Sequence, residues 1–205
     1  VYIAESVNMI EFRNVTKTFK NPGDAPLYVF RNVSFILPPH VNIGVLGKNG
    51  AGKSTLLRLI AGALHPDSGR ILTDKSISWP IGLTSGLQRD LSGLDNVRFI
   101  CRVYGLTKEE IIEIVDFVRE CADIGEHFYK PVKFYSPGTR ARFNFSLCMA
   151  FDFDYYLVDE ATAVGDAEFK KRGALIFKER CKHSNQIMVL HDLDELRKEC
   201  QVGVV

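Results

Sequence analysis

The chain has 205 residues, of which 46% are hydrophobic and 25% are charged, and its formal net charge is +1. These values are typical of a folded globular protein, and the near-zero charge excludes a global attraction to nucleic acid or acidic lipid. No apolar run approaches the length of a membrane-spanning helix, and the start of the chain lacks the basic and apolar regions of a secretory signal.

The N-terminal part of the chain predicts strands and one helix. Met9 is the first methionine, so we expect residues 1–8 to be an upstream extension. Residues 9–19 alternate apolar and polar side chains and predict a strand, and 28–37 predict a second strand after a turn at 21–26. Residues 41–47 predict a short buried strand ending in glycine. Residues 53–64 carry one apolar helical face, and a turn at 65–71 leads to another strand.

The pattern changes to helices from about residue 93 to 150, where Thr107 and Glu110 have the spacing of a capping box. Strands return at 155–158 and 186–190, with a polar helix at 167–182 between them. This order predicts an α/β fold with a mostly parallel sheet, an N-terminal antiparallel β portion and an inserted helical subdomain at about 93–150.

Cysteines and histidines give no sign of a metal site. The five cysteines are odd in number, widely spaced and without a C-x-x-C pair. This predicts reduced thiols rather than disulfides or zinc. The five histidines also lack the spacing of metal ligands, so we expect no metal site built by the protein alone.

Residues 47–54, GKNGAGKS, match the phosphate-loop pattern G-x-x-x-x-G-K-[ST] between a predicted strand and a predicted helix. The glycines let backbone N–H groups point at phosphate oxygens, Lys53 reaches the β- and γ-phosphates, and the Ser54 hydroxyl can bind Mg²⁺. The motif thus predicts that the loop holds a ligand with β- and γ-phosphates together with Mg²⁺. The predicted phosphate-binding residues are Gly47, Asn49, Gly50, Ala51, Gly52, Lys53, Ser54 and Thr55.

Two later strands end in polar residues that suit the same site. Asp159 and Glu160 follow the strand 155–158, and ligands of open α/β sheets lie beyond the carboxyl ends of the strands. Asp159 is predicted to hold Mg²⁺ opposite Ser54, and Glu160 to orient or deprotonate the attacking water. His191 ends the strand 186–190, and we expect it to contact the γ-phosphate and position that water.

The segment 135–139, YSPGT, predicts the start of a helix. Ser136 is a good N-cap, and Pro137 suits the first helical position. A helix N-terminus binds anions, so Ser136 and the amides of Gly138 and Thr139 can bind an anionic group. Pro137 has no N–H, so one potential donor is missing.

Together these motifs resemble the nucleotide-binding subunit of ABC transporters, over about residue 10 to the C-terminus. The segments 77–83, 91–99, 153–160 and 163–172 are closer still to the ATPase subunits of bacterial capsule and O-antigen polysaccharide exporters. The resemblance implies a single ABC-type ATP-binding domain over 9–205. It also implies that the sequence is truncated after residue 205, because the family usually continues with another strand and helix.

In that family two subunits sandwich two ATP molecules, and each phosphate loop faces the signature segment of the partner. The resemblance thus assigns Ser136, Gly138 and Thr139 to the partner's ATP, Glu160 and His191 to catalysis, and Asp166 to a dimer contact. It implies a homodimer on the cytoplasmic face of the bacterial inner membrane, docked under a polytopic membrane permease. ATP hydrolysis there would power export of a lipid-linked polysaccharide, and no nucleic-acid partner is expected.

Three positions depart from the family pattern. Phe19 stands where a tyrosine usually stacks on adenine, and it can stack without offering a hydroxyl. Gln88 is the candidate for the glutamine that binds metal in the family, although alignment on 91–96 places that position near 82–83; alternatively, Gln88 is a surface loop residue. The signature usually has the sequence Leu-Ser-Gly-Gly-Gln, and here it is Tyr-Ser-Pro-Gly-Thr.

Two other functions remain open from the sequence. A non-transport ABC-type ATPase of DNA repair or translation would need a long coiled-coil insert, a second ATPase cassette or a basic face. A small-molecule kinase would need an acceptor pocket and a lid that carries arginines, and Arg140 and Arg142 are the candidates for such a lid.

Overall fold

The structure is a computed structural model that describes residues 9–20, 23, 25–81, 87–159, 166–190 and 192–204. The chain divides into two compact units. The first comprises 1–80, 153–160 and 183–205, and the second comprises 81–152 and 161–182.

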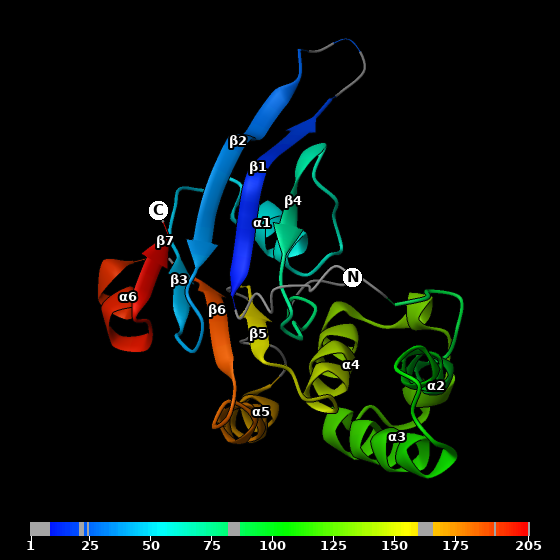
Figure 1. Ribbon diagram of the computed structural model, residues 1–205. Helices are drawn as coiled ribbons and strands as arrows, with labels where there is room; N and C mark the ends of the chain where they lie inside the picture. The colour runs from blue at the N-terminus through cyan, green and yellow to red at the C-terminus, as the bar shows by residue number, and fades with distance from the viewer. Residues whose placement is uncertain are drawn as a thin grey trace, which may run out of the picture. The chain divides into compact units, whose positions relative to one another are not determined.

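The first unit contains an antiparallel sheet with the strand order β2-β1-β4. Its strands are β1 (Ile10–Phe19), β2 (Leu27–Leu37) and β4 (Ser68–Leu72). In β1 the side chains alternate between buried and more exposed positions, as a sheet with one face toward the core requires. The long β1–β2 pair is the blue ribbon of Figure 1.

The first unit also contains a parallel sheet with the order β5-β6-β3-β7. These strands are β5 (Tyr155–Val158), β6 (Asn185–Val189), β3 (Ile43–Val45) and β7 (Val202–Val204), and they lie side by side in Figure 1. Helix α1 (Lys53–Ile60) follows β3, and α6 (Leu193–Glu199) precedes β7. Leu57 of α1, Leu157 of β5 and Ile187 of β6 are fully buried in one core cluster. This packing fixes the start of α1 beside the carboxyl ends of β3, β5 and β6.

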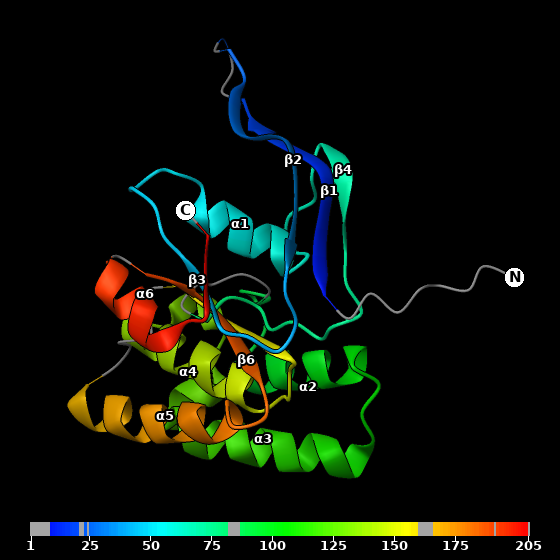
Figure 2. The ribbon, with the colours of Figure 1, turned by 60° about the vertical axis from the view of Figure 1, so that its left-hand side comes forward.

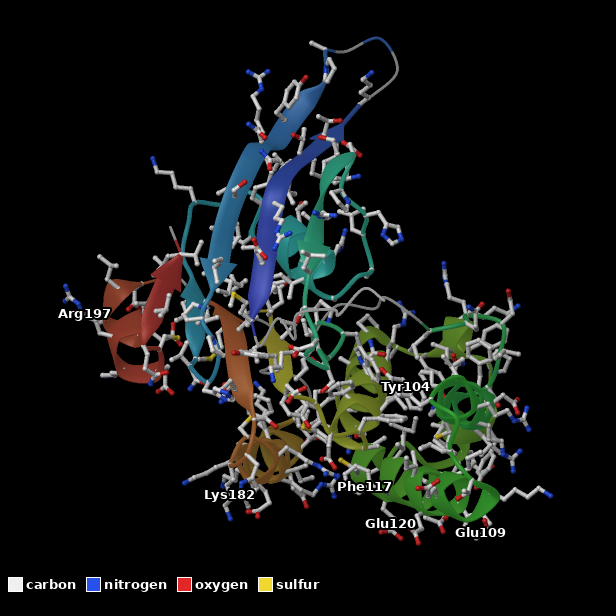
Figure 3. All side chains as sticks on the ribbon, in the orientation of Figure 1. Tyr104, Glu109, Phe117, Glu120, Lys182 and Arg197 are labelled. Carbon is white, nitrogen blue, oxygen red and sulfur yellow. The ribbon has the colours of Figure 1, made fainter. Side chains whose placement is uncertain are left out.

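The second unit is built from helices, which form one group in Figure 2. They are α2 (Gly93–Val103), α3 (Lys108–Ala122), α4 (Pro137–Met149) and α5 (Ala167–Arg180), with the 3-10 turns η1 (Gly125–Tyr129) and η2 (Val132–Phe134). Helix α3 packs on α2 and α4, and α4 packs on α5. The capping box predicted for Thr107 and Glu110 is present, and Glu109 and Glu120 of α3 are exposed (Figure 3).

The observed elements confirm the predicted fold class: a parallel sheet, an antiparallel β portion and an inserted set of helices. All five cysteines are free thiols. Within the described ranges, none of the helices is long and apolar enough to cross a bilayer.

Candidate nucleotide-binding site

The phosphate loop leaves the start of α1 open to a ligand. Gly50 and Gly52 have φ angles of 82° and 98°, in the left-handed region that favours glycine. Gly52 is the N-cap of α1, makes no side-chain capping hydrogen bond, and is followed by no acidic residue in the first turn. A helix N-terminus without a cap has free N–H donors and partial positive charge, which suits a phosphate group.

Gly52 is also required by its neighbour on the β2 strand. A Cβ at Gly52 would lie 2.4 Å from Cγ1 of Val29, whereas a Cβ at Gly50 would meet nothing within 4 Å. The loop therefore passes against β2 at Gly52 and is open at Gly50. Nothing in the motif indicates Val29, because the contact depends on how the antiparallel sheet is placed over the loop.

Lys53 lies across its own loop. Its Nζ donates to the carbonyl oxygens of Gly47 at 2.7 Å and Lys48 at 3.3 Å. These bonds hold the ammonium group at the centre of the loop, where the motif places phosphate oxygens. Phosphate oxygens carry more negative charge than backbone carbonyls, so they are the stronger partners for this ammonium group.

Ser54 and Asp159 are 105 positions apart in sequence, and the fold brings them together. The Ser54 hydroxyl donates to Oδ2 of Asp159 at 3.2 Å. The pairing arises because α1 starts beside the carboxyl end of β5, after which Asp159 immediately follows. A hydroxyl and a carboxylate are the hard oxygen ligands that Mg²⁺ prefers, so these two residues fit the ion.

A cleft of about 390 Å³ extends from this pair to the antiparallel sheet. Lys53, Ser54 and Asp159 line one part of it, and Phe19 and Val29 line another. The Phe19 ring is 44% exposed, and the Lys17 ammonium lies 5.7 Å from its centroid. Phe19 thus offers an accessible aromatic face in the same cleft as the phosphate loop, which suits a stacked base.

Asp67 holds the strand that carries Phe19. Its carboxylate accepts hydrogen bonds from Lys17 Nζ at 2.7 Å, from the Thr18 amide at 2.6 Å and from the Thr18 hydroxyl at 2.8 Å. These bonds, that of Lys17 first, lower the pKa of Asp67 to about 2. No local sequence pattern indicates this anchor, because the partners of Asp67 are 49 and 50 positions away.

The signature segment starts α4 as predicted. Ser136 is the N-cap, Pro137 occupies the first turn, and the Thr139 N–H donates to Ser136 Oγ at 3.1 Å. The two hydroxyls, Ser136 Oγ and Thr139 Oγ1, are 2.8 Å apart. The Thr139 amide is therefore already bonded within the cap, whereas the sequence interpretation had it facing a phosphate together with the Gly138 amide.

A second cavity, of about 570 Å³, lies entirely within the helical unit at this helix start. Gly138 and Thr139 line it with Arg142 and Asp166, and so do Asp123 and His127. Asp123 and His127 were missed by the sequence analysis. They belong to no motif and reach the cavity only because α3 packs on α4.

The remaining predicted residues have different outcomes. Glu160 and His191 lie outside the described residues. The backbone N–H and C=O of Gln88 are bonded to the buried Asn96 side chain at 2.8 and 3.0 Å, which fixes the loop before α2. The two candidate lid arginines are engaged: Arg140 donates to the Tyr135 carbonyl, and Arg142 to the Ala122 carbonyl.

The open helix N-terminus, the lysine across the loop and the Ser54–Asp159 pair together define a nucleotide-binding P-loop protein. The chain belongs to the ABC transporter family, whose sequence profile matches residues 30–163. It is an ATPase of the ABC type, as the resemblance predicted.

Several curated relatives align over most of the chain. The polysialic acid transport ATP-binding protein KpsT of Escherichia coli is 49% identical and aligns with 96% of this chain and 87% of its own length. The ATP-binding protein BexA of Haemophilus influenzae is 39% identical and aligns with 96% of this chain and 89% of its own length. The capsule polysaccharide export ATP-binding protein CtrD of Neisseria meningitidis serogroup B is 41% identical, over 86% and 81%.

Solved structures share the fold. The ATP-binding cassette MJ0796, in a dimeric post-hydrolysis state bound to ADP and Pi, has a TM-score of 0.71 at 22% identity. The match covers 91% of this chain and 89% of that one.

Proposed function

We propose that this chain is the ATP-hydrolysing subunit of an exporter for capsular or similar lipid-linked polysaccharide. The observation that carries the ATPase part is the Ser54–Asp159 pair beside Lys53 at an uncapped helix start. The transport part is supported by relatives of up to 49% identity, named for polysialic acid transport and capsule polysaccharide export.

Each predicted site residue of the first unit has a role in the proposed reaction. The loop amides and Lys53 bind the β- and γ-phosphates, and Phe19 stacks on the adenine ring. Ser54 and Asp159 would hold Mg²⁺, which when bound neutralises charge that develops on the phosphates. Glu160 orients or deprotonates the attacking water, and His191 contacts the γ-phosphate and positions that water.

The proposed assembly is a homodimer at the cytoplasmic face of the bacterial inner membrane, docked on a polytopic membrane permease. Ser136, Gly138 and Thr139 of one subunit act on the ATP bound by the other, and Asp166 lies at the dimer contact. The fold likeness to a dimeric ATP-binding cassette supports this arrangement. Gln88 is retained as the candidate for the metal-binding glutamine. We propose a single ATP-binding domain over 9–205, with its helical subdomain at about 93–150.

A Glu160→Gln variant tests the ATPase and the dimer together. It should bind ATP, hydrolyse it at least about a hundredfold more slowly than wild type, and elute as a dimer in ATP. Lys53→Ala should neither bind nor dimerise, and Lys48→Ala, an exposed residue of the same loop, is the matched control. Normal turnover of Glu160→Gln without a trapped dimer would contradict the proposal.

The transport part needs the membrane partner. The wild-type ATPase should be stimulated on reconstitution with its permease in lipid vesicles, and a Lys53→Ala strain should lose surface polysaccharide. Stimulation by nucleic acid instead would favour the DNA-repair or translation alternative. Phosphate transfer to a nucleoside monophosphate would favour a kinase. Against that alternative, both candidate lid arginines, Arg140 and Arg142, are bonded to backbone carbonyls.

A further inference from the structure

Arg142 joins three helices of the second unit. It lies on α4, four residues after Gly138 and so one turn further along the same face. Its Nε donates to the Ala122 carbonyl at 3.0 Å, and its NH2 donates to Asp123 Oδ2 at 3.1 Å. Its NH1 is 3.5 Å from Asp166 Oδ2. Arg142 is thus bonded to the end of α3 and to the residue that starts α5.

Two of these contacts satisfy the end of α3. Ala122 is the last residue of that helix, and its carbonyl has no partner within the helix. Asp123 caps the helix in the left-handed conformation, with φ 49°. The Arg142 side chain is only 20% exposed. A largely buried charge is costly without partners, and the three acceptors supply them.

The third contact reaches the start of α5. Asp166 is the N-cap of α5 and accepts the Phe169 N–H at 2.9 Å. The Phe169 amide first, and Arg142 as well, hold the pKa of Asp166 below its usual value, so the carboxylate is charged at neutral pH. The Arg142 guanidinium also lies 4.8 Å from the Phe169 ring centroid. Arg142 therefore links the first turn of α5 to α4, beside the contact between the Phe145 and Phe169 rings.

In the chain, residues 160–165 are all that separate Asp159 from Asp166. Asp166 is also the residue that the proposed function places at the dimer contact. On α4, the same arginine lies one turn from the signature residues that the proposed function assigns to the partner's ATP.

We propose that Arg142 is a positioning residue for ATP hydrolysis, which keeps the signature end of α4 and Asp166, the N-cap of α5, in one fixed arrangement. This role rests on the proposed function, and it concerns turnover rather than ATP binding. Arg142 does not line the nucleotide cleft of its own chain, whose lining residues all belong to the first unit.

Arg172 of α5 provides a matched control. Its NH2 donates to the Cys121 carbonyl at 3.0 Å, and its guanidinium lies 5.7 Å from the Phe169 ring and 3.8 Å from Asp123. It thus supports the same end of α3 and the same ring. In the part of the chain that the structure describes, no hydrogen bond or ion pair joins Arg172 to α4 or to Asp166.

The experiment compares Arg142→Gln, Arg142→Lys and Arg172→Gln in the purified full chain. We expect Arg142→Gln to lower kcat by about tenfold or more while KM for ATP stays within about twofold. Arg142→Lys should recover part of kcat, because it keeps the charge but loses the forked geometry. Arg172→Gln should lower the melting temperature but leave kcat within about twofold of wild type.

A double variant tests the link to Asp166. Adding Asp166→Asn to Arg142→Gln should lower kcat by less than about twofold more, because the two residues act through one contact. Losses that multiply, or equal kcat losses in Arg142→Gln and Arg172→Gln, would overturn the proposal.

Hydrogen exchange at the Phe169 amide separates this inference from the proposed function. Exchange should be faster in Arg142→Gln than in wild type and unchanged in Arg172→Gln. An inactive wild type would reject the proposed function, and this measurement would still test Arg142. Equal exchange in Arg142→Gln and wild type would overturn the positioning role.

Discussion

The helices α1 and α4 both start at sites assigned to phosphate, yet their N-termini are built in opposite ways. Gly52 caps α1 with no side chain, and the amides of the first turn are left for a ligand. Ser136 caps α4 with its own hydroxyl, takes up the Thr139 amide, and is followed by a proline without an N–H. A glycine N-cap costs a helix only roughly a few tenths of a kcal/mol relative to serine, so α1 loses little stability by leaving its amides free.

This difference shows which end depends on a ligand. The α1 terminus has its lysine, its metal-type oxygen pair and its aromatic face in one cleft of one unit. The α4 terminus is complete as a helix start without a ligand. In the proposed function, the phosphate that it meets is bound by the second subunit. Each prediction below alters one side of this contrast.

The largest effect is expected from Gly52→Ala. Alanine at a φ of 98° is strained, and its Cβ would lie 2.4 Å from Val29 Cγ1. Gly50→Ala has a similar positive φ but open space around it. We expect Gly52→Ala to lower the free energy of unfolding by at least about 1 kcal/mol more than Gly50→Ala, measured by urea denaturation.

Val29→Ala is the check on the cause. If the clash is responsible, Val29→Ala combined with Gly52→Ala should recover part of the lost stability. Equal losses in the two glycine variants would mean that the backbone angle alone decides, and that the contact with β2 is unimportant.

An intermediate effect is expected at Asp67, which fastens the strand carrying Phe19. Its folded pKa of about 2 lies below the ordinary value, so its contribution to stability is present above pH 4 and is lost as the pH falls toward 2. Asp67→Asn should therefore be less stable than wild type at pH 7, and the difference should shrink between about pH 4 and 2.

Asp74→Asn, at an exposed aspartate after β4, is the control for the loss of one surface charge. The difference in the free energy of unfolding between Asp74→Asn and wild type should change less on acidification than the difference for Asp67→Asn. A stability difference between Asp67→Asn and wild type that stays constant from pH 7 to 2 would contradict the assigned anchor. The readout is the free energy of unfolding at each pH.

The same contrast explains what the sequence could predict. The phosphate loop is a local pattern, so its residues could be named from spacing alone. Asp159 follows from the rule that ligands lie at the carboxyl ends of parallel strands, and the 3.2 Å contact with Ser54 agrees with it. These predictions needed only the order of the elements.

Contacts between distant segments could not be predicted in this way. Val29 meets Gly52, and Asp67 bonds to the strand of Phe19, only because of how the antiparallel sheet is placed. Arg142 was a candidate lid residue in the kinase alternative and is instead bonded to the end of α3. The Thr139 amide is taken by the serine that the sequence identified as a cap, because a cap and an anion compete for the same N–H groups. The sequence therefore predicts where a helix begins. It does not predict whether the N–H groups at that end bond to a capping side chain or to a ligand.

The smallest effect is expected from Pro137→Gly, which restores the missing N–H at the α4 terminus. We expect ATP-driven dimerisation to become faster, because one more amide can meet the partner's γ-phosphate. The helix should lose only about 1 kcal/mol or less, since glycine raises the entropy of the unfolded chain. The rate is measured by stopped-flow light scattering in the Glu160→Gln background, where hydrolysis does not reverse the association.

Pro137→Ala distinguishes the amide from flexibility. Alanine also restores the N–H, but it keeps a Cβ and a helical preference. If both variants dimerise faster, the amide is responsible. Acceleration by glycine alone would assign the effect to a looser helix start, and no change in either variant would show that this donor plays no part. In that last case the α4 terminus would act through Ser136 and Gly138, and the proline at position 137 would have no effect on dimerisation.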